Sequence, residues 1–193
     1  MTNIICYTGG TCGDLLTAFF DTSKAKVDPN GSVLHDKHRT LLKKPHATCE
    51  LEKIKFLQQC QYLSVPSHSL QFHVDHAHDF YSVSVDSKAD ALWAAARFRD
   101  LHKPHVWLEM CQACGVDSID GYAQTLLDYS NMVAHYTNKI VKLEYILDGS
   151  ALDKISNICD CELDPEAAKF YSDWLNINEK LCNTGQRRSQ YQN

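Results

Sequence analysis

The feature that most constrains the fold of this chain is a glycine-rich segment between an apolar run and an amphipathic run. Residues 4–7 (Ile-Ile-Cys-Tyr) are strand-like, residues 8–14 (Thr-Gly-Gly-Thr-Cys-Gly-Asp) form a turn, and apolar residues at helical spacing follow over 15–20. A strand, a glycine turn and a helix in this order aim backbone N–H groups and a helix dipole at an anion. The pattern predicts an α/β domain with a phosphate- or nucleotide-binding loop. Its candidate binding residues are Gly9, Gly10, Thr11, Cys12, Gly13 and Asp14.

The loop differs from a Walker A loop, which ends in Gly-Lys-Ser/Thr. Here Asp14 follows Gly13, and no lysine occurs before Lys24. Asp14 also has a structural explanation, because a carboxylate at a helix start accepts free N–H groups. A tight turn that binds nothing is therefore one alternative. The second alternative is a methyltransferase, because residues 13–16 (Gly-Asp-Leu-Leu) resemble the end of the glycine loop in some S-adenosylmethionine-dependent methyltransferases.

Composition limits the functional classes. A length of 193 residues predicts one domain, and the formal net charge of −5 argues against general electrostatic binding of nucleic acid. No apolar run is long enough to span a bilayer and no signal-like segment is present, so we expect a cytoplasmic protein with no membrane partner. We expect a single α/β domain over residues 1–183 and a polar C-terminal tail over residues 184–193.

The nine cysteines are expected to be free thiols, because no export signal accompanies them. Two close pairs could together offer four thiolates to zinc: Cys111 with Cys114, and Cys159 with Cys161. The first pair falls in an expected helix without the glycine-bearing knuckle of a zinc ribbon. Small buried side chains are therefore the favoured interpretation, and no metal site is predicted.

A histidine cluster is the second candidate for chemistry. Residues 73–79 (His-Val-Asp-His-Ala-His-Asp) hold three imidazoles and two carboxylates. On a strand, His76 and His78 would share one face, which permits a metal site or a general base at a strand end. A solvated loop is the structural alternative. We predict that His76, His78 or His73 is the catalytic base.

Hydrophobic periodicity predicts strands separated by helices along the rest of the chain. Helices are expected over residues 48–63, 89–102, 107–114, 118–136, 151–158 and 165–181, strands over 70–74, 80–85 and 140–147, and a polar loop or insertion over 21–45. This alternation predicts a three-layer α/β fold with a mostly parallel sheet and helices on both faces. Ligands of such sheets bind at the carboxyl ends of the strands. The loop at 9–14, the cluster at 73–79 and the strand end at 85–87 would then share one rim.

The order of these features resembles that of the sulfotransferases, a branch of the P-loop fold. By the order of elements, the resemblance covers about two thirds of the chain. Residues 7–16 resemble the phosphate loop, 83–90 the strand and turn that follow the catalytic histidine, and 141–147 a late strand, while His73, His76 or His78 falls near that histidine. The resemblance implies transfer of a sulfuryl or phosphoryl group from a nucleotide donor, 3′-phosphoadenylyl sulfate or ATP, to a small hydroxyl-bearing acceptor.

Basic groups that the resemblance implies are missing here. The loop holds no basic residue for the 5′ phosphosulfate, and Asp86 stands near the family's strand-end arginine, which binds the 3′ phosphate. Ala94 or Ala95 falls near the serine of the next helix, and Arg97 and Arg99 lie farther along that helix. The alternative function is therefore a non-catalytic binding or assembly protein that retains the P-loop-like fold.

Overall fold

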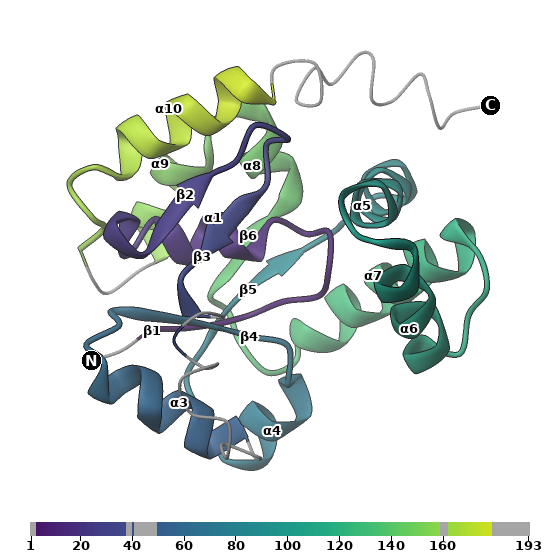
Figure 1. Ribbon diagram of the computed structural model, residues 1–193. Coiled ribbons are helices and arrows are strands. Elements are labelled where there is room, and N and C mark those ends of the chain that lie inside the picture. The colour runs from purple at the N-terminus through teal and green to yellow at the C-terminus, as the bar shows by residue number, and fades with distance from the viewer. Residues whose placement is uncertain (1–2, 38–39, 41–49, 159–161, 179–193) are drawn as a thin grey trace.

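A parallel sheet forms the centre of the protein (Figure 1). The structure, a computed structural model, describes residues 3–37, 40, 50–158 and 162–178. Four strands pair in parallel in the order β4-β1-β5-β6. Their bounds are Ser64–Ser67 for β4, Asn3–Cys6 for β1, Tyr81–Ser84 for β5 and Ile140–Lys142 for β6. The expected α/β architecture with a parallel sheet is confirmed.

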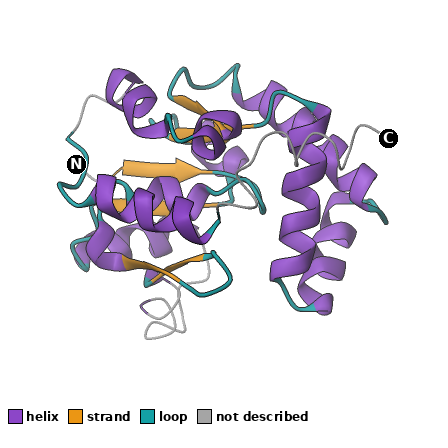
Figure 2. Cartoon of the chain, turned by 90° about the horizontal axis from the view of Figure 1, so that it is seen from above, coloured by secondary structure: helices purple, strands orange, loops and turns teal. Residues whose placement is uncertain are grey.

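Helices surround the sheet, and a small hairpin lies apart from it (Figure 2). The antiparallel hairpin consists of β2 (Ala25–Val27) and β3 (Val33–His35). The helices are α1 (Gly13–Ala18), the 3-10 helix η1 (Thr22–Lys24), α3 (Glu50–Gln59), α4 (Leu70–Asp75), α5 (Lys88–Leu101), α6 (Pro104–Cys114), α7 (Ile119–Val133), α8 (Leu143–Asp148), α9 (Ala151–Ile158) and α10 (Ala167–Ile177). No helix among the described residues combines the length and apolarity needed to cross a bilayer.

The continuous apolar run of β1 is explained by burial on both faces of the sheet. Ile4 packs in one cluster with Leu70 of α4 and Val133 of α7. Its neighbour Ile5 belongs to the main core, together with Leu16 of α1. Successive side chains of a strand point to opposite faces, so two covered faces require apolar residues at every position.

Strand order decides where a ligand would bind. The chain passes from β1 to β4 on one side and then returns to β5 on the other side of β1. Ligands of open parallel sheets bind outside the carboxyl ends of the strands at such a reversal. The glycine loop that follows β1 stands at this point.

The strand predicted over residues 70–74 is wrong. Residues 70–74 belong to α4, whose buried residues Leu70 and His73 are three positions apart, as on one face of a helix. Short apolar runs do not distinguish strand from helix. The strand before β5 is instead β4, which sequence patterns did not predict because it contains two serines and Pro66. The proline is tolerated because β4 lies at the sheet edge.

The strand predicted over residues 140–147 is too long. It ends at Lys142 and continues as α8, whose buried residues Leu143, Ile146 and Leu147 follow helical spacing. The expected insertion over 21–45 contains η1 and the β2–β3 hairpin among its described residues.

The helix predictions are confirmed with shifts at their ends. Helices α3, α5, α6, α7, α9 and α10 lie within or close to the predicted ranges. Pro104 begins α6 rather than only ending the helix before it, because the first helical turn tolerates a missing N–H. The predicted end of the last helix at 179–181 and the tail over 184–193 lie outside the described residues.

Candidate functional site

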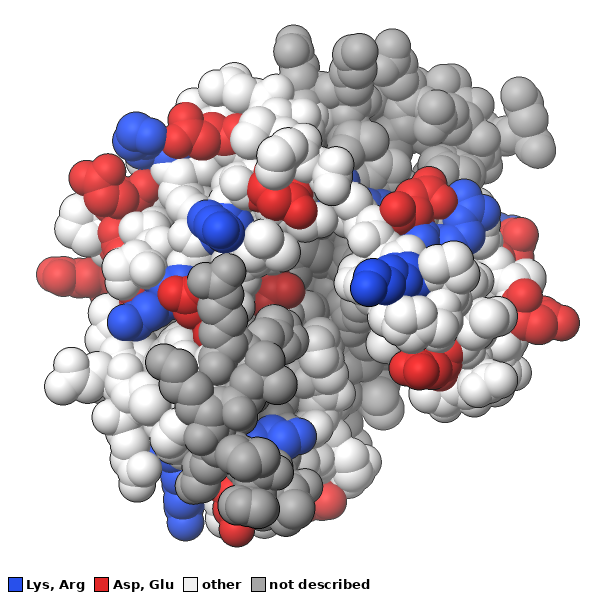
Figure 3. All heavy atoms as spheres, in the orientation of Figure 1, with Lys and Arg blue, Asp and Glu red and all other residues white. Residues whose placement is uncertain are grey.

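A cavity of about 630 Å³ lies beside the glycine loop, within the range of small-molecule sites. Three parts of the chain line most of it: the loop with the start of α1, the β2–β3 hairpin, and the adjoining ends of α5 and α6. His68, which follows β4, also lines it. On the face shown in Figure 3, the surface is hollowed between the part of the molecule that carries the hairpin and the part that carries α5 to α7.

The glycines of the loop allow close packing. Gly10 has a φ of +90°, and a Cβ there would lie 2.3 Å from the carbonyl oxygen of Ala94 in α5. A Cβ on Gly13 would lie 1.9 Å from Cγ of Tyr7. Only glycine, which has no Cβ, fits at these two positions without displacing its neighbours. Packing against α5 and Tyr7 therefore accounts for these two glycines, whether or not the loop binds a ligand.

The loop presents the start of α1 to the cavity. Gly9, Gly10, Cys12, Gly13 and Asp14 line the cavity. Cys12, in the left-handed region at φ 61°, is the N-cap of α1, and its side chain makes no capping hydrogen bond. Leu15 and Leu16 donate to the carbonyl oxygen of Cys12, whereas the N–H groups of Gly13 and Asp14 have no acceptor within the helix, so a ligand in the cavity could accept from these two.

Thr11, the remaining candidate of the loop, is placed differently. Its side chain is buried, and it is not among the residues that line the cavity. Its hydroxyl donates to the carbonyl oxygen of Thr8 at 2.8 Å. Thr11 thus stabilises the turn from within.

Tyr7 orients two groups of the cavity wall. Its hydroxyl donates to Oδ1 of Asp14 at 2.6 Å, and its ring meets that of His68 edge to face at 4.6 Å. Burial, with the negative charge of Asp14, raises the pKa of Tyr7 well above its ordinary value. The phenol is therefore a permanent donor that holds Asp14 in place.

His35 is a buried cavity residue that sequence patterns did not identify. It ends β3 and is 4% exposed, and the N–H of Lys37 donates to its Nδ1 at 3.2 Å. Burial lowers the pKa of His35 to about 4, so the ring is neutral at pH 7 and its proton is on Nε2. This Nε2 has no hydrogen-bond partner among the described residues. The structure therefore supplies an unsatisfied donor beside the cavity.

Acid should destabilise the fold through His35. The pKa of His35 falls from 6.5 to about 4 on folding, so between these pH values the unfolded chain binds the additional proton. Stability therefore falls as the pH drops from 6.5 towards 4, by up to about 3 kcal/mol. Urea denaturation from pH 4 to 7.5 should show a flatter profile for His35→Phe than for the wild type. The same replacement at exposed His105 is the control, and parallel profiles for all three proteins would contradict the assignment.

Arg97 supplies a cation to the cavity from α5. Its Nη2 donates to the carbonyl oxygen of Gly31 at 2.9 Å, and its guanidinium lies 5.5 Å from the ring centre of Trp93. A guanidinium has several N–H donors, so this contact leaves donors for an anion. Arg99, two positions on, is exposed and pairs with Asp100 at 2.8 Å. Sequence position alone could not distinguish the two arginines.

The predicted catalytic histidines lie in α4 and the turn after it, and none lines the cavity. His73 is fully buried, with Nε2 2.8 Å from Oγ of Ser67 and Nδ1 3.1 Å from Nδ1 of His78. His76 is exposed, and its Nδ1 lies 2.8 Å from the carbonyl oxygen of Phe72. The structure thus joins His73 to His78 but keeps them apart from the cavity, and their catalytic role stays a prediction.

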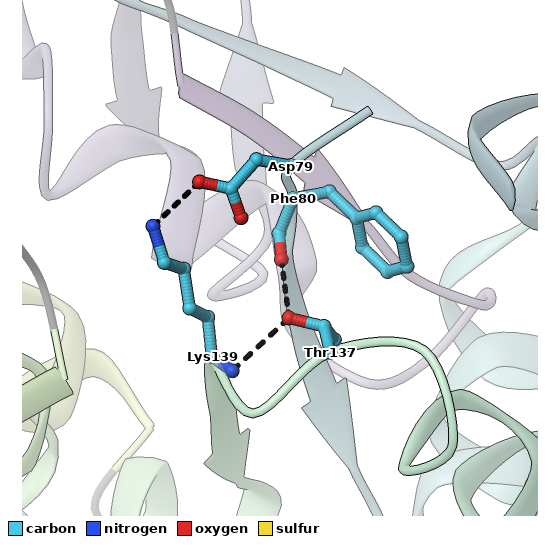
Figure 4. Close-up of polar contacts among 4 residues, drawn as sticks. All are labelled: Asp79, Phe80, Thr137 and Lys139. Atoms are coloured by element: carbon cyan, nitrogen blue, oxygen red, sulfur yellow. Dashed lines mark hydrogen bonds and ion pairs between the residues drawn. The ribbon is translucent and has the colours of Figure 1, made fainter. Parts of the chain in front are cut away.

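The expectation that the histidine cluster and the glycine loop share one rim is wrong for residues 76–79, whereas His73 contacts Ser67 at the carboxyl end of β4. Lys139, which precedes β6, donates to Asp79 at 2.6 Å, and Thr137 donates to the carbonyl oxygen of Phe80 at 2.8 Å (Figure 4). These contacts lie where the chain enters β5 and β6. Helix α4 returns the chain from the carboxyl end of β4 to the amino end of β5, so residues 76–79 occupy the opposite edge of the sheet.

Metal ligands do not gather in the described part of the chain. No group of three or more His, Cys, Asp or Glu side chains there could hold a metal ion. Cys111 and Cys114 are free thiols on α6, and burial raises the pKa of both. Cys159 and Cys161 lie outside the described residues, so the four-thiolate zinc site stays untested.

Comparison of the chain with protein-family models, with curated proteins and with solved structures finds no match. A functional conclusion therefore depends on the geometry of the cavity and on the chemistry of the residues that line it.

Proposed function

We propose that this protein is a nucleotide-dependent group transferase, which moves a sulfuryl or phosphoryl group onto a hydroxyl acceptor. One observation carries the proposal: the glycine loop and Arg97 line the same cavity, next to the point where the strand order reverses. This is where open parallel sheets bind their ligands. The donor would be 3′-phosphoadenylyl sulfate or ATP.

The donor phosphate is held from two sides in this proposal. The N–H groups of Gly13 and Asp14 receive it at the start of α1, and the guanidinium of Arg97 supplies the positive charge that the loop lacks. Transfer of such groups depends mainly on positioning and on stabilisation of the developing charge. His76 and His78 do not line the cavity, so as proton acceptors they would have to act from outside it. The carboxylates that line the cavity are better placed to accept the proton of the hydroxyl.

Replacement of Arg97 should weaken nucleotide binding. Arg97→Gln removes a charge-assisted contact of about 1.5–3 kcal/mol, so we expect roughly 10- to 100-fold weaker binding of the affected nucleotide. Isothermal titration of the wild-type protein and its variants would use adenosine 3′,5′-bisphosphate and, separately, ATP with magnesium. Arg99→Gln is the matched control and should keep wild-type affinity, because Arg99 points to Asp100 at the surface. Equal losses in the two variants would contradict the role of Arg97.

A non-catalytic binding or assembly protein is the second candidate. It is favoured by the packing that explains the loop glycines, and by carboxylates that share the cavity with Arg97: Asp14, Asp28 and Asp36. A nucleotide at about 100 times its dissociation constant should stabilise the protein by about 2.7 kcal/mol. If thermal unfolding shifts with neither nucleotide, the transferase proposal fails and this candidate takes its place.

A further inference from the structure

We infer that Asp14 and His35 together form the subsite for the hydroxyl group of the acceptor. Nε2–H of His35 donates to the hydroxyl oxygen, and Oδ2 of Asp14 accepts the hydroxyl proton. The inference rests on the proposed function and specifies where the acceptor hydroxyl binds in the cavity. Both residues line the cavity, one from the β2–β3 hairpin and one from α1.

The donor is the unsatisfied Nε2 of His35. Buried polar groups in folded proteins almost always have a hydrogen-bond partner, and an orphan calls for an explanation. Here the unpaired Nε2 belongs to a residue of the cavity wall that is 4% exposed. A ligand oxygen that reaches Nε2 would satisfy it.

The proton acceptor is Asp14. Its Oδ1 receives the hydroxyl of Tyr7, which fixes the carboxylate without protonating it. No hydrogen bond or ion pair engages Oδ2 within the part of the chain that the structure describes. Asp14 is half-buried, and its charge acts directly on the imidazole of His35, so the two groups are electrostatic neighbours.

The local charge favours a neutral group over an anion. The carboxylates of Asp14, Asp21 and Asp36 each raise the pKa of His35, and among its neighbours the ammonium of Lys37 opposes them. An anionic oxygen at Nε2 would meet this excess of negative charge. A hydroxyl is neutral and both donates and accepts, so it can pair with a carboxylate and with an N–H donor at once. The anionic donor then stays at the N–H groups of the loop and at Arg97, away from Nε2 of His35.

The wall around this subsite indicates what carries the hydroxyl. Val33 and Leu34 of the hairpin and Val106 and Met110 of α6 line the same cavity, so an alkyl or aryl body would be desolvated there. Nε2 is covered in this structure, so the inference includes a shift of the hairpin that opens Nε2 to the cavity when the hydroxyl binds. The two hairpin strands pair with each other and not with the main sheet, which permits such a movement.

The transfer step balances with these groups. The O–H bond of the acceptor breaks, and its proton moves to Oδ2 of Asp14. The acceptor oxygen forms a bond to the sulfur or phosphorus of the donor. The bond between that atom and the bridging oxygen breaks, and its electron pair leaves with the nucleotide phosphate beside Arg97. Asp14 then releases its proton to water.

The test compares three probes that differ in one group: 4-butylphenol, its methyl ether 4-butylanisole, and 4-butylbenzoate. Ligand-observed NMR titrations at pH 7 would measure their affinities for the wild-type protein. We expect the phenol to bind about tenfold more tightly than the ether, which cannot donate, and than the benzoate, which is anionic. Equal affinities, or no binding of the phenol at millimolar concentration, would overturn the inference.

Variants assign the effect to the two residues. His35→Phe and Asp14→Asn should each weaken phenol binding about tenfold, and His35→Gln, which retains an N–H donor, should restore most of it. His102→Phe changes another histidine of the cavity wall and should keep the phenol preference. A preference that survives in His35→Phe and Asp14→Asn contradicts the subsite, once thermal unfolding shows that both variants are folded. No nucleotide is present, so a failure here is distinct from a failure of nucleotide binding.

Discussion

Gly10→Ala should lower the free energy of unfolding by about 4 kcal/mol, the sum of backbone strain at positive φ and of overlap with a rigid neighbour. Gly10 has a φ of +90°, and the added Cβ would lie 2.3 Å from the carbonyl oxygen of Ala94. That oxygen belongs to the backbone of α5, so it cannot move away as a side chain could. Denaturation with urea at constant pH would measure the loss.

Gly149→Ala is a matched control for this change. Gly149 has a φ of +89°, but its nearest neighbour would be Cδ1 of Leu175 at 3.7 Å, an ordinary contact. Only the backbone strain then applies, and we expect a loss of about 1–2 kcal/mol. Equal losses at the two glycines would show that the loop does not pack closely against α5, which would contradict this part of the cavity wall.

Trp174→Ala should cost about 3–5 kcal/mol, as expected for removal of a buried tryptophan. Trp174 is 1% exposed on α10, its ring centre lies 6.4 Å from that of Tyr171, and the guanidinium of Arg97 lies 6.0 Å from it. The change would leave a void in the core and remove a wall of the cavity. Equilibrium unfolding in urea measures the loss.

The control for Trp174 lies on the same helix. Ile177 is 48% exposed, so Ile177→Ala should change stability by no more than about 0.5 kcal/mol. Similar small effects of the two substitutions would mean that α10 does not pack on the core through Trp174.

The same contacts link stability to the cavity. Arg97 and Asn178 both donate to the carbonyl oxygen of Gly31, at 2.9 and 3.2 Å, so the hairpin tip is bound to α5 and to the end of α10. A nucleotide held by the remaining N–H donors of Arg97 would lie next to this contact. Donor binding and hairpin position are therefore expected to influence each other.

Much of the local structure could be predicted from sequence. The strand, turn and helix over residues 4–20 follow from an apolar run, closely spaced glycines and helical spacing of apolar residues. Local sequence patterns gave the wrong secondary structure where contacts with distant parts of the chain determine it. Pro66 lies in a strand because β4 is at the sheet edge, and residues 70–74 are helical because Leu70 and His73 face the core.

The candidate site was predictable in part. The loop residues that line the cavity were recognised from their glycines, whereas Arg97 could not be preferred over Arg99. His35 left no sequence signal, because its importance comes from burial and from an unpaired Nε2. Burial and pairing depend on residues far away in the chain.

By itself, the sequence determined that this protein has an α/β fold with a glycine loop after its first strand, because hydrophobic periodicity and glycine placement act over a few neighbouring residues. Only the tertiary structure decided which chemistry meets that loop. The strand order set the cavity beside β1, α4 carried residues 76–79 to the opposite edge of the sheet, and the hairpin and α5 brought His35 and Arg97 to the cavity. These placements arise from packing between elements distant in sequence, which no local pattern encodes.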